Sequence, residues 1–107
     1  MYTMADVTHI VMRYINKWAD EFINEMASYL YFKTTDNLPV AERIEISKKR
    51  FETVKETIAA HCTEYIVSDR ARWRKENDLE SYLSLYVMDD YAAAFSKDLL
   101  DLCKVAS

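Results

Sequence analysis

The chain has 107 residues, a formal net charge of −4, an apolar fraction of 50%, one proline and no glycine. This length fits one domain over residues 1–107, and an apolar content this high excludes a disordered chain. Tight β-turns and bulges depend on the positive φ angles that glycine accepts, so a chain without glycine is expected to be all-α, with no β-sheet.

The first predicted helix begins near Thr3 and runs to about Lys33. Thr3 and Asp6 have the spacing of a capping box, in which a hydroxyl and a carboxylate satisfy N–H groups at the start of a helix. Apolar side chains then recur at helical spacing, which predicts a broad buried face. This stripe consists of Val7, Val11, Tyr14, Trp18, Phe22, Met26 and Tyr29.

The segment TTDNLP, Thr34–Pro39, is the clearest break in the sequence. Its polar residues can cap a new helix, and Pro39 suits a first turn because no N–H is needed there. The second predicted helix has two alternative ends, one near Ser68 and one near Glu76. Its apolar residues recur every seven positions, at Ile44, Phe51, Ile58 and Tyr65.

The last predicted helix begins at a cap formed by Asn77 and Asp78. Its apolar seam follows spacings of three and four, at Leu85, Met88, Ala92, Phe95, Leu99 and Leu102. Short links make neighbouring helices antiparallel. We therefore expect a bundle of three long antiparallel helices, or four if the second helix breaks, either alone or paired with a second copy of the chain.

The sequence offers few groups for catalysis or metal binding. Its two histidines, His9 and His61, do not complete a zinc or di-iron ligand pattern. Cys62 follows His61 directly, but neighbours on a helix do not face each other, so activating this thiol would need a base from elsewhere. We therefore expect no enzyme activity, no metal site and no cofactor. Cys62 and Cys103 are expected to be buried thiols in a reducing compartment.

Nothing in the sequence predicts export or membrane insertion. The first residues, MYTMADVTHIVMRY, lack the basic start and continuous apolar run of a signal peptide. No stretch approaches the roughly 18 uncharged apolar residues of a membrane-spanning helix. We therefore expect a cytoplasmic protein that does not enter a membrane.

The stretch SDRARWRKEND concentrates positive charge around Trp73. On a helix Arg70 and Arg74 share a face, so they could contact phosphates while Trp73 stacks on a base, and heptads follow as in zipper-type DNA-binding helices. The same residues could form a protein contact or a homodimer seam, because Arg and Trp are enriched at interface hot spots. A third interpretation is structural, with the arginines near the last carbonyls of a helix and paired with neighbouring carboxylates.

Residues 77–107 carry the whole net charge of −4, and the rest of the chain is balanced. This charge favours a basic protein partner over a phosphate backbone. We interpret the chain as an inhibitor, immunity-type protein or regulator that blocks a basic partner, such as a nucleic-acid-processing protein. The alternative is a nucleic-acid-binding regulator that uses Arg70–Lys75 and dimerises through its helices. The expected partner-binding residues are Tyr86, Asp89, Asp90 and Tyr91, with a second contact at Arg70, Trp73 and Arg74.

Overall fold

The structure is a computed structural model that describes residues 4–33, 37–67 and 76–106. Within these ranges the chain forms no strand and five helices: α1 (Met4–Lys17), α2 (Ala19–Lys33), α3 (Val40–Val67), α4 (Glu76–Leu83) and α5 (Asp89–Ala106). The all-α prediction is confirmed. No helix in the described ranges is both long enough and apolar enough to cross a membrane. Arg70, Trp73, Arg74 and the alternative helix end at Ser68 lie outside the described residues.

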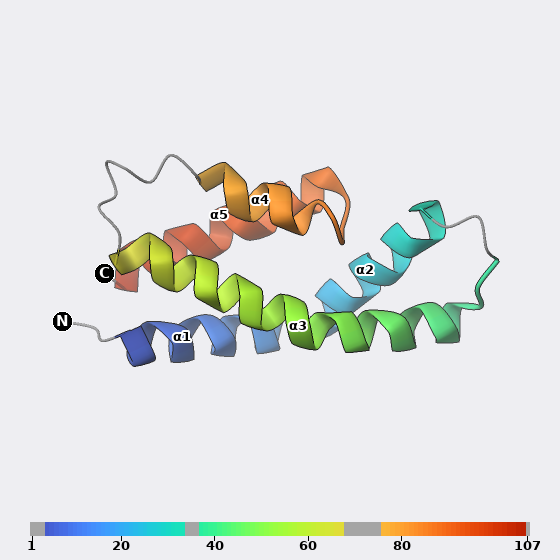
Figure 1. Cartoon of the computed structure of the whole chain (residues 1–107), viewed down its shortest axis with the longest axis horizontal. Helices are drawn as coiled ribbons and strands as arrows, with labels where there is room; N and C mark the ends of the chain where they lie inside the picture. The colour runs from blue at the N-terminus through green and yellow to red at the C-terminus, as the bar shows by residue number, and fades with distance from the viewer. Residues whose placement is uncertain (1–3, 34–36, 68–75, 107) are drawn as a thin grey trace.

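The helices are arranged along one long axis. α1 and α3 run antiparallel, and α4 and α5 form an antiparallel pair that packs on them through α5 (Figure 1). α2 leaves the end of α1 at an angle and packs on α3. The molecule measures 48 × 24 × 17 Å. The start of α1 and the end of α5 lie at one end of the long axis, and the end of α2 lies toward the other (Figure 1).

The first predicted helix is interrupted at Trp18, whereas the sequence predicted one helix over residues 3–33. The Trp18 N–H lies 3.3 Å from the carbonyl oxygen of Tyr14 and 3.2 Å from that of Ile15, so both accept it. The Trp18 carbonyl still accepts the N–H of Phe22 at 2.9 Å. Because the backbone bends without losing these hydrogen bonds, the break requires neither glycine nor proline. The bend gives α1 and α2 different directions against α3.

The last predicted helix is two helices joined by a turn at residues 84–88. N–H groups in the turn bond to carbonyl oxygens three or four residues earlier, at 2.9–3.1 Å. The prediction that Leu85 and Met88 belong to the buried seam is wrong, since they are 65% and 41% exposed. Val87 is fully buried in their place, because the turn changes which side chains face the core.

The core lies where α5, with α4 packed against it, covers the other three helices. Phe22 of α2 is at its centre, with ring centroids 5.8 Å from Phe51 of α3 and 5.0 Å from Phe95 of α5. The predicted apolar spacing is confirmed in part. Trp18, predicted to be buried, is 38% exposed, and the side chains of Val7 and Tyr65 lie outside the description. The predicted positions that are buried are Val11, Phe22, Met26, Phe51, Ile58, Ala92, Phe95 and Leu99. The most deeply buried large side chains are Val11, Ile15, Phe22, Met26, Val54, Ile58, Cys62, Leu79, Leu83, Val87 and Leu99.

Candidate functional site

The predicted acidic pair, Asp89 and Asp90, is exposed in the first turn of α5. The Oδ1 atom of Asp90 accepts the backbone N–H of Tyr91 at 2.8 Å. Carboxylates are favourable at this position because the N-terminus of a helix carries partial positive charge. The two aspartates therefore stabilise the start of α5 as well as presenting charge to solvent.

The two predicted tyrosines, Tyr86 and Tyr91, are half-buried. The ring of Tyr86 lies 5.4 Å from that of Tyr82, and the ring of Tyr91 stacks on Phe95 at 5.7 Å. Tyr91 also meets Phe22 edge to face at 5.8 Å. Tyr91 is thus part of the packing between α2 and α5, and less of it reaches solvent than its predicted role in partner binding suggested.

Carboxylates from α2 lie close to the Tyr91 phenol. Burial raises the pKa of Tyr91 above its ordinary value, and the charges of Glu21 and Glu25 raise it further. Burial also raises the pKa of Tyr14, followed by the charges of Asp98 and Glu21. Negative charge from α2 and α5 therefore surrounds these two phenols.

A hollow of about 220 Å³ lies beside these groups, between the α1–α2 bend and α5. We call it the aromatic–acidic hollow, and its lining residues are Tyr14, Trp18, Glu21, Tyr91, Ala94, Phe95 and Asp98. The rings of Tyr14 and Trp18 are 6.4 Å apart, and Trp18 is 38% exposed. The Lys17 Nζ lies 5.7 Å from the centroid of the Trp18 ring. Aromatic faces beside carboxylates suit an organic cation such as a lysine or arginine side chain.

A second hollow, of about 350 Å³, lies between the end of α2 and the start of α5. Tyr29 and Lys33 line it from α2, opposite Met88, Asp89 and Asp90. The Lys33 Nζ lies 5.5 Å from the centroid of the Tyr29 ring. This places the predicted acidic pair beside a tyrosine of another helix.

An exposed aromatic pair, Tyr31 and Phe32, occupies the last turn of α2. The two side chains are 61% and 67% exposed, and their rings meet edge to face at 5.3 Å. The guanidinium of Arg43 from α3 lies 4.9 Å from the centroid of the Tyr31 ring. Large exposed aromatic rings of this kind are enriched at protein interfaces.

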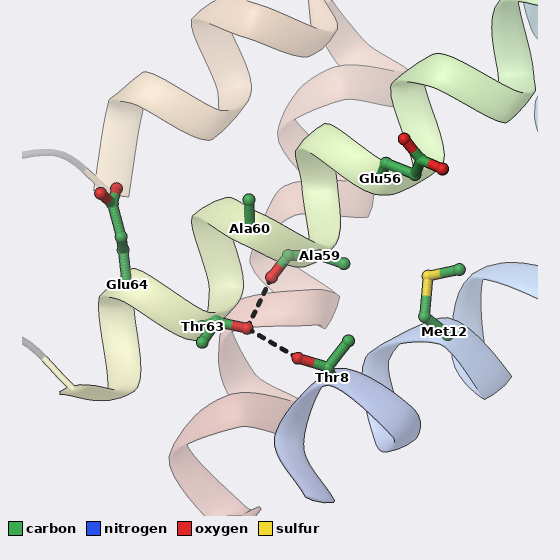
Figure 2. Close-up of a pocket in the computed structure, with 7 residues that line it drawn as sticks. All are labelled: Thr8, Met12, Glu56, Ala59, Ala60, Thr63 and Glu64. Carbon is green, nitrogen blue, oxygen red and sulfur yellow. Dashed lines mark hydrogen bonds between the residues drawn. The ribbon is translucent and has the colours of Figure 1, made fainter. Parts of the chain in front are cut away.

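A third cavity is a groove of about 460 Å³ between α1 and α3 (Figure 2). Thr63 of α3 donates from its hydroxyl to the carbonyl oxygen of Ala59 at 2.8 Å, and its Oγ1 lies 3.2 Å from that of Thr8 in α1. Figure 2 shows Ala59, Ala60 and Thr63 lying between two glutamates of α3. The residues that line the groove are Thr8, Met12, Glu56, Ala59, Ala60, Thr63 and Glu64.

Cys62, Cys103 and His61 lie in the core or against it. Cys62 and Cys103 are 0% and 1% exposed and do not form a disulfide, so their predicted burial is confirmed. Their mutual hydrogen bond and their burial raise the pKa of the Cys62 thiol far above its ordinary value. Because the thiolate is the reactive form, Cys62 is held in its unreactive state. His61 packs on Tyr82, with ring centroids 5.7 Å apart.

The described part of the chain holds no cluster of three or more His, Cys, Asp or Glu side chains arranged to bind a metal ion. The structure brings the predicted Asp89 and Asp90 next to α2, whereas the predicted Arg70, Trp73 and Arg74 lie outside the described residues. Sequence reasoning missed Glu21 and Asp98 as site residues. They line the same hollow only because α2 packs beside α5, and no pattern in the sequence predicts that pairing.

Comparison of the chain with protein-family models, with curated proteins and with solved structures found no match. The functional argument therefore depends on the surfaces described above.

Proposed function

We propose that this chain is a non-catalytic helical protein that binds another protein with a basic surface and blocks it, as an inhibitor, immunity-type protein or regulator. The proposal extends to a cytoplasmic setting and to a nucleic-acid-processing partner. The observation that carries it is the aromatic–acidic hollow, which Glu21 and Asp98 line together with the exposed ring of Trp18 and the half-buried rings of two tyrosines. A lysine or arginine of the partner fits this combination of charge and π-surface.

Further support comes from the surface beyond the hollow. Asp89 and Asp90 extend the negative charge along α5, and Tyr31 and Phe32 add exposed aromatic area at the end of α2. Charge of one sign steers a partner of the opposite sign during association, while buried aromatic contacts slow dissociation. Together these surfaces have the chemistry of an interface with a basic protein.

The test compares two double variants with the same change in net charge. Glu21→Gln with Asp98→Asn neutralises the aromatic–acidic hollow. Glu42→Gln with Asp101→Asn neutralises two exposed carboxylates that do not line it. A partner is first captured from extract of the source cells, with and without nuclease treatment. Its association rate is then measured with each variant.

We expect neutralisation of the hollow to slow association by about tenfold at low salt, with a smaller effect for the control pair. The difference in association rate between the two double variants should shrink as salt is added, because salt screens the long-range electrostatic attraction between the partners. Equal effects of the two double variants would contradict the role of the hollow. Recovery of nucleic acid in place of a protein, with loss after nuclease treatment, would favour the alternative in which Arg70–Lys75 binds phosphates.

A further inference from the structure

The α1–α3 groove is a second surface with its own chemistry, in a different part of the fold from the aromatic–acidic hollow. It is formed by the middle of α1 and the second half of α3, and α5 lies behind these two helices in the view of Figure 2. The aromatic–acidic hollow instead lies between the α1–α2 bend and α5. No described residue lines both cavities.

Alanine side chains and one methionine make the floor of the groove apolar. Ala59 is buried, while Ala60, one position further along α3, is exposed. Met12 contributes its side chain from α1. Small side chains along a helix allow close approach of another helix, because ridges of one surface fit between those of the other. A volume of about 460 Å³ is large enough for several side chains of such a helix.

The two threonine hydroxyls of the groove are already hydrogen-bonded. The Thr63 hydroxyl donates to the carbonyl oxygen of Ala59 at 2.8 Å, and the Thr8 hydroxyl lies 3.2 Å from the Thr63 oxygen. A buried polar group is costly when it lacks a partner. These groups keep their partners when an apolar face covers them, so covering the groove carries a small desolvation cost.

The charge on the rim indicates what covers the floor. Glu56 and Glu64 line the groove, both exposed, and no basic side chain is among its described lining residues. They are eight residues apart on α3, which places their backbones about 12 Å apart along the helix. A partner helix that lies along the groove can pair with both carboxylates. It needs lysines or arginines about two turns apart on the side that faces α3.

We propose that the α1–α3 groove is a docking site for a basic amphipathic helix of another protein. The apolar face of that helix, with residues at i, i+3, i+4 and i+7, covers Ala59, Ala60 and Met12. Its flanking lysines or arginines pair with Glu56 and Glu64. This proposal goes beyond the proposed function, because it concerns a separate surface and a defined secondary structure in the partner.

The experiment uses the intact chain and two labelled helical peptides of about 20 residues. Both carry the same Leu and Ala stripe, and one is flanked by lysines and the other by glutamates. Binding is followed by fluorescence anisotropy. Ala60→Phe fills the groove, and Ala41→Phe, the matched control, places the same side chain at an exposed alanine in the first turn of α3, outside the groove lining. Glu56→Lys with Glu64→Lys reverses the charge of the rim.

We expect the lysine peptide to bind and Ala60→Phe to weaken it by about tenfold or more, while Ala41→Phe stays within about twofold of the unmodified chain. Rim reversal should weaken the lysine peptide and strengthen the glutamate peptide, with both effects reduced by salt. Circular dichroism and thermal unfolding establish that each variant is folded. If Ala60→Phe does not fold, the rim reversal alone decides the outcome.

Several results would overturn the proposal. The lysine peptide could fail to bind up to about 1 mM, or both peptides could bind equally. Amide chemical-shift changes could cluster at Trp18, Glu21 and Asp98 instead of at Thr8 and Ala60, which would assign the peptide to the aromatic–acidic hollow. Light scattering could show a dimer that Ala60→Phe dissociates, in which case a second copy of the chain occupies the groove. Loss of the groove site would leave the proposed function intact, because that depends on Glu21 and Asp98.

Discussion

The rings of Phe22 and Phe95 meet edge to face with their centroids 5.0 Å apart, and this contact joins α2 to α5. Phe22 also lies 5.8 Å from Phe51 of α3 and is fully buried. One side chain therefore connects three helices. Aromatic pairs in such arrangements add stability beyond the area they bury.

We expect Phe22→Ala to lower the free energy of unfolding by about 3–5 kcal/mol, because it removes buried area and leaves a cavity that three helices must close. Urea denaturation followed by circular dichroism measures this loss. Phe32→Ala is the control, since Phe32 is 67% exposed, and its effect should stay within about 0.5 kcal/mol. Similar losses at the two positions would show that Phe22 does not have this central role.

A substitution at Ser47 is expected to raise the free energy of unfolding, the opposite of the effect at Phe22. The Ser47 side chain is fully buried in α3, and its hydroxyl has no hydrogen-bond partner in the described part of the chain. Ser47→Ala removes this unsatisfied group, so we expect the free energy of unfolding to rise by about 1 kcal/mol. The exposed Ser81 of α4 provides the control, because Ser81→Ala changes helix propensity without relieving a buried hydroxyl. An equal gain at both positions would assign the effect to propensity alone.

Tyr91 should make stability sensitive to alkaline pH. Burial, followed by the charges of Glu21 and Glu25, raises its pKa in the folded state above the unfolded value of about 10. The folded state thus favours the neutral phenol, and this contribution is complete below pH 10 and lost as pH rises through the folded pKa. Denaturation midpoints between about pH 9 and pH 11 should fall less steeply for Tyr91→Phe than for the unmodified chain. Parallel slopes would show that Tyr91 ionises normally.

Asp90 should contribute to stability through the start of α5. Because its carboxylate accepts the N–H of Tyr91 at 2.8 Å near a helix N-terminus, Asp90→Ala should cost about 0.5–1 kcal/mol. Asp101→Ala, at an exposed position further along α5, should cost nothing measurable. Thermal unfolding of both variants at low salt tests this. An unchanged midpoint for Asp90→Ala would show that Asp90 does not stabilise α5. A change in partner association caused by this variant would then be due to the lost charge and not to a loss of stability.

The Cys62 thiol should resist modification in the folded chain. It is fully buried, and its pKa is raised by its hydrogen bond to Cys103 and by burial. Reaction with an aromatic disulfide reagent at pH 8 therefore requires opening of the α3–α5 contact. We expect labelling in minutes or longer without denaturant and in seconds with it. The measurement uses a Cys103→Ser variant, in which Cys62 is the one thiol and keeps a hydrogen-bonding side chain beside it. Immediate labelling of this folded variant would contradict the burial of Cys62.

The sequence was sufficient to predict the helical class and much of the core. The absence of glycine argued against β-turns, and the spacing of Val11, Phe22, Ile58 and Leu99 placed buried side chains correctly. These features are local or periodic, so they can be read along the chain. The prediction and the structure differ at Trp18 and at residues 84–88. At Trp18 one N–H is shared between two carbonyl oxygens, and in the turn some N–H groups bond to the carbonyl three residues earlier instead of four. Neither place contains glycine or proline, so no composition signal marked it.

The candidate site was predictable only in part. Asp89 and Asp90 were selected because residues 77–107 carry the whole net negative charge of the chain, and both are exposed. Glu21 and Asp98 are far apart in the sequence, and they line one hollow because the bend at Trp18 brings α2 beside α5. Such a meeting depends on tertiary packing, which spacing along one helix does not encode.

The contact between α5 and the helices α1, α2 and α3 also has a consequence for how the chain folds during synthesis. Phe95 and Leu99 close over side chains such as Val11, Phe22 and Ile58, which emerge from the ribosome much earlier. Until α5 has been made, the apolar faces of the earlier helices lack this cover, and pairings over such long sequence separations are slow to form. A nascent chain halted before residue 89 should therefore bind chaperones that recognise exposed apolar surface, and it should release them once α5 is complete.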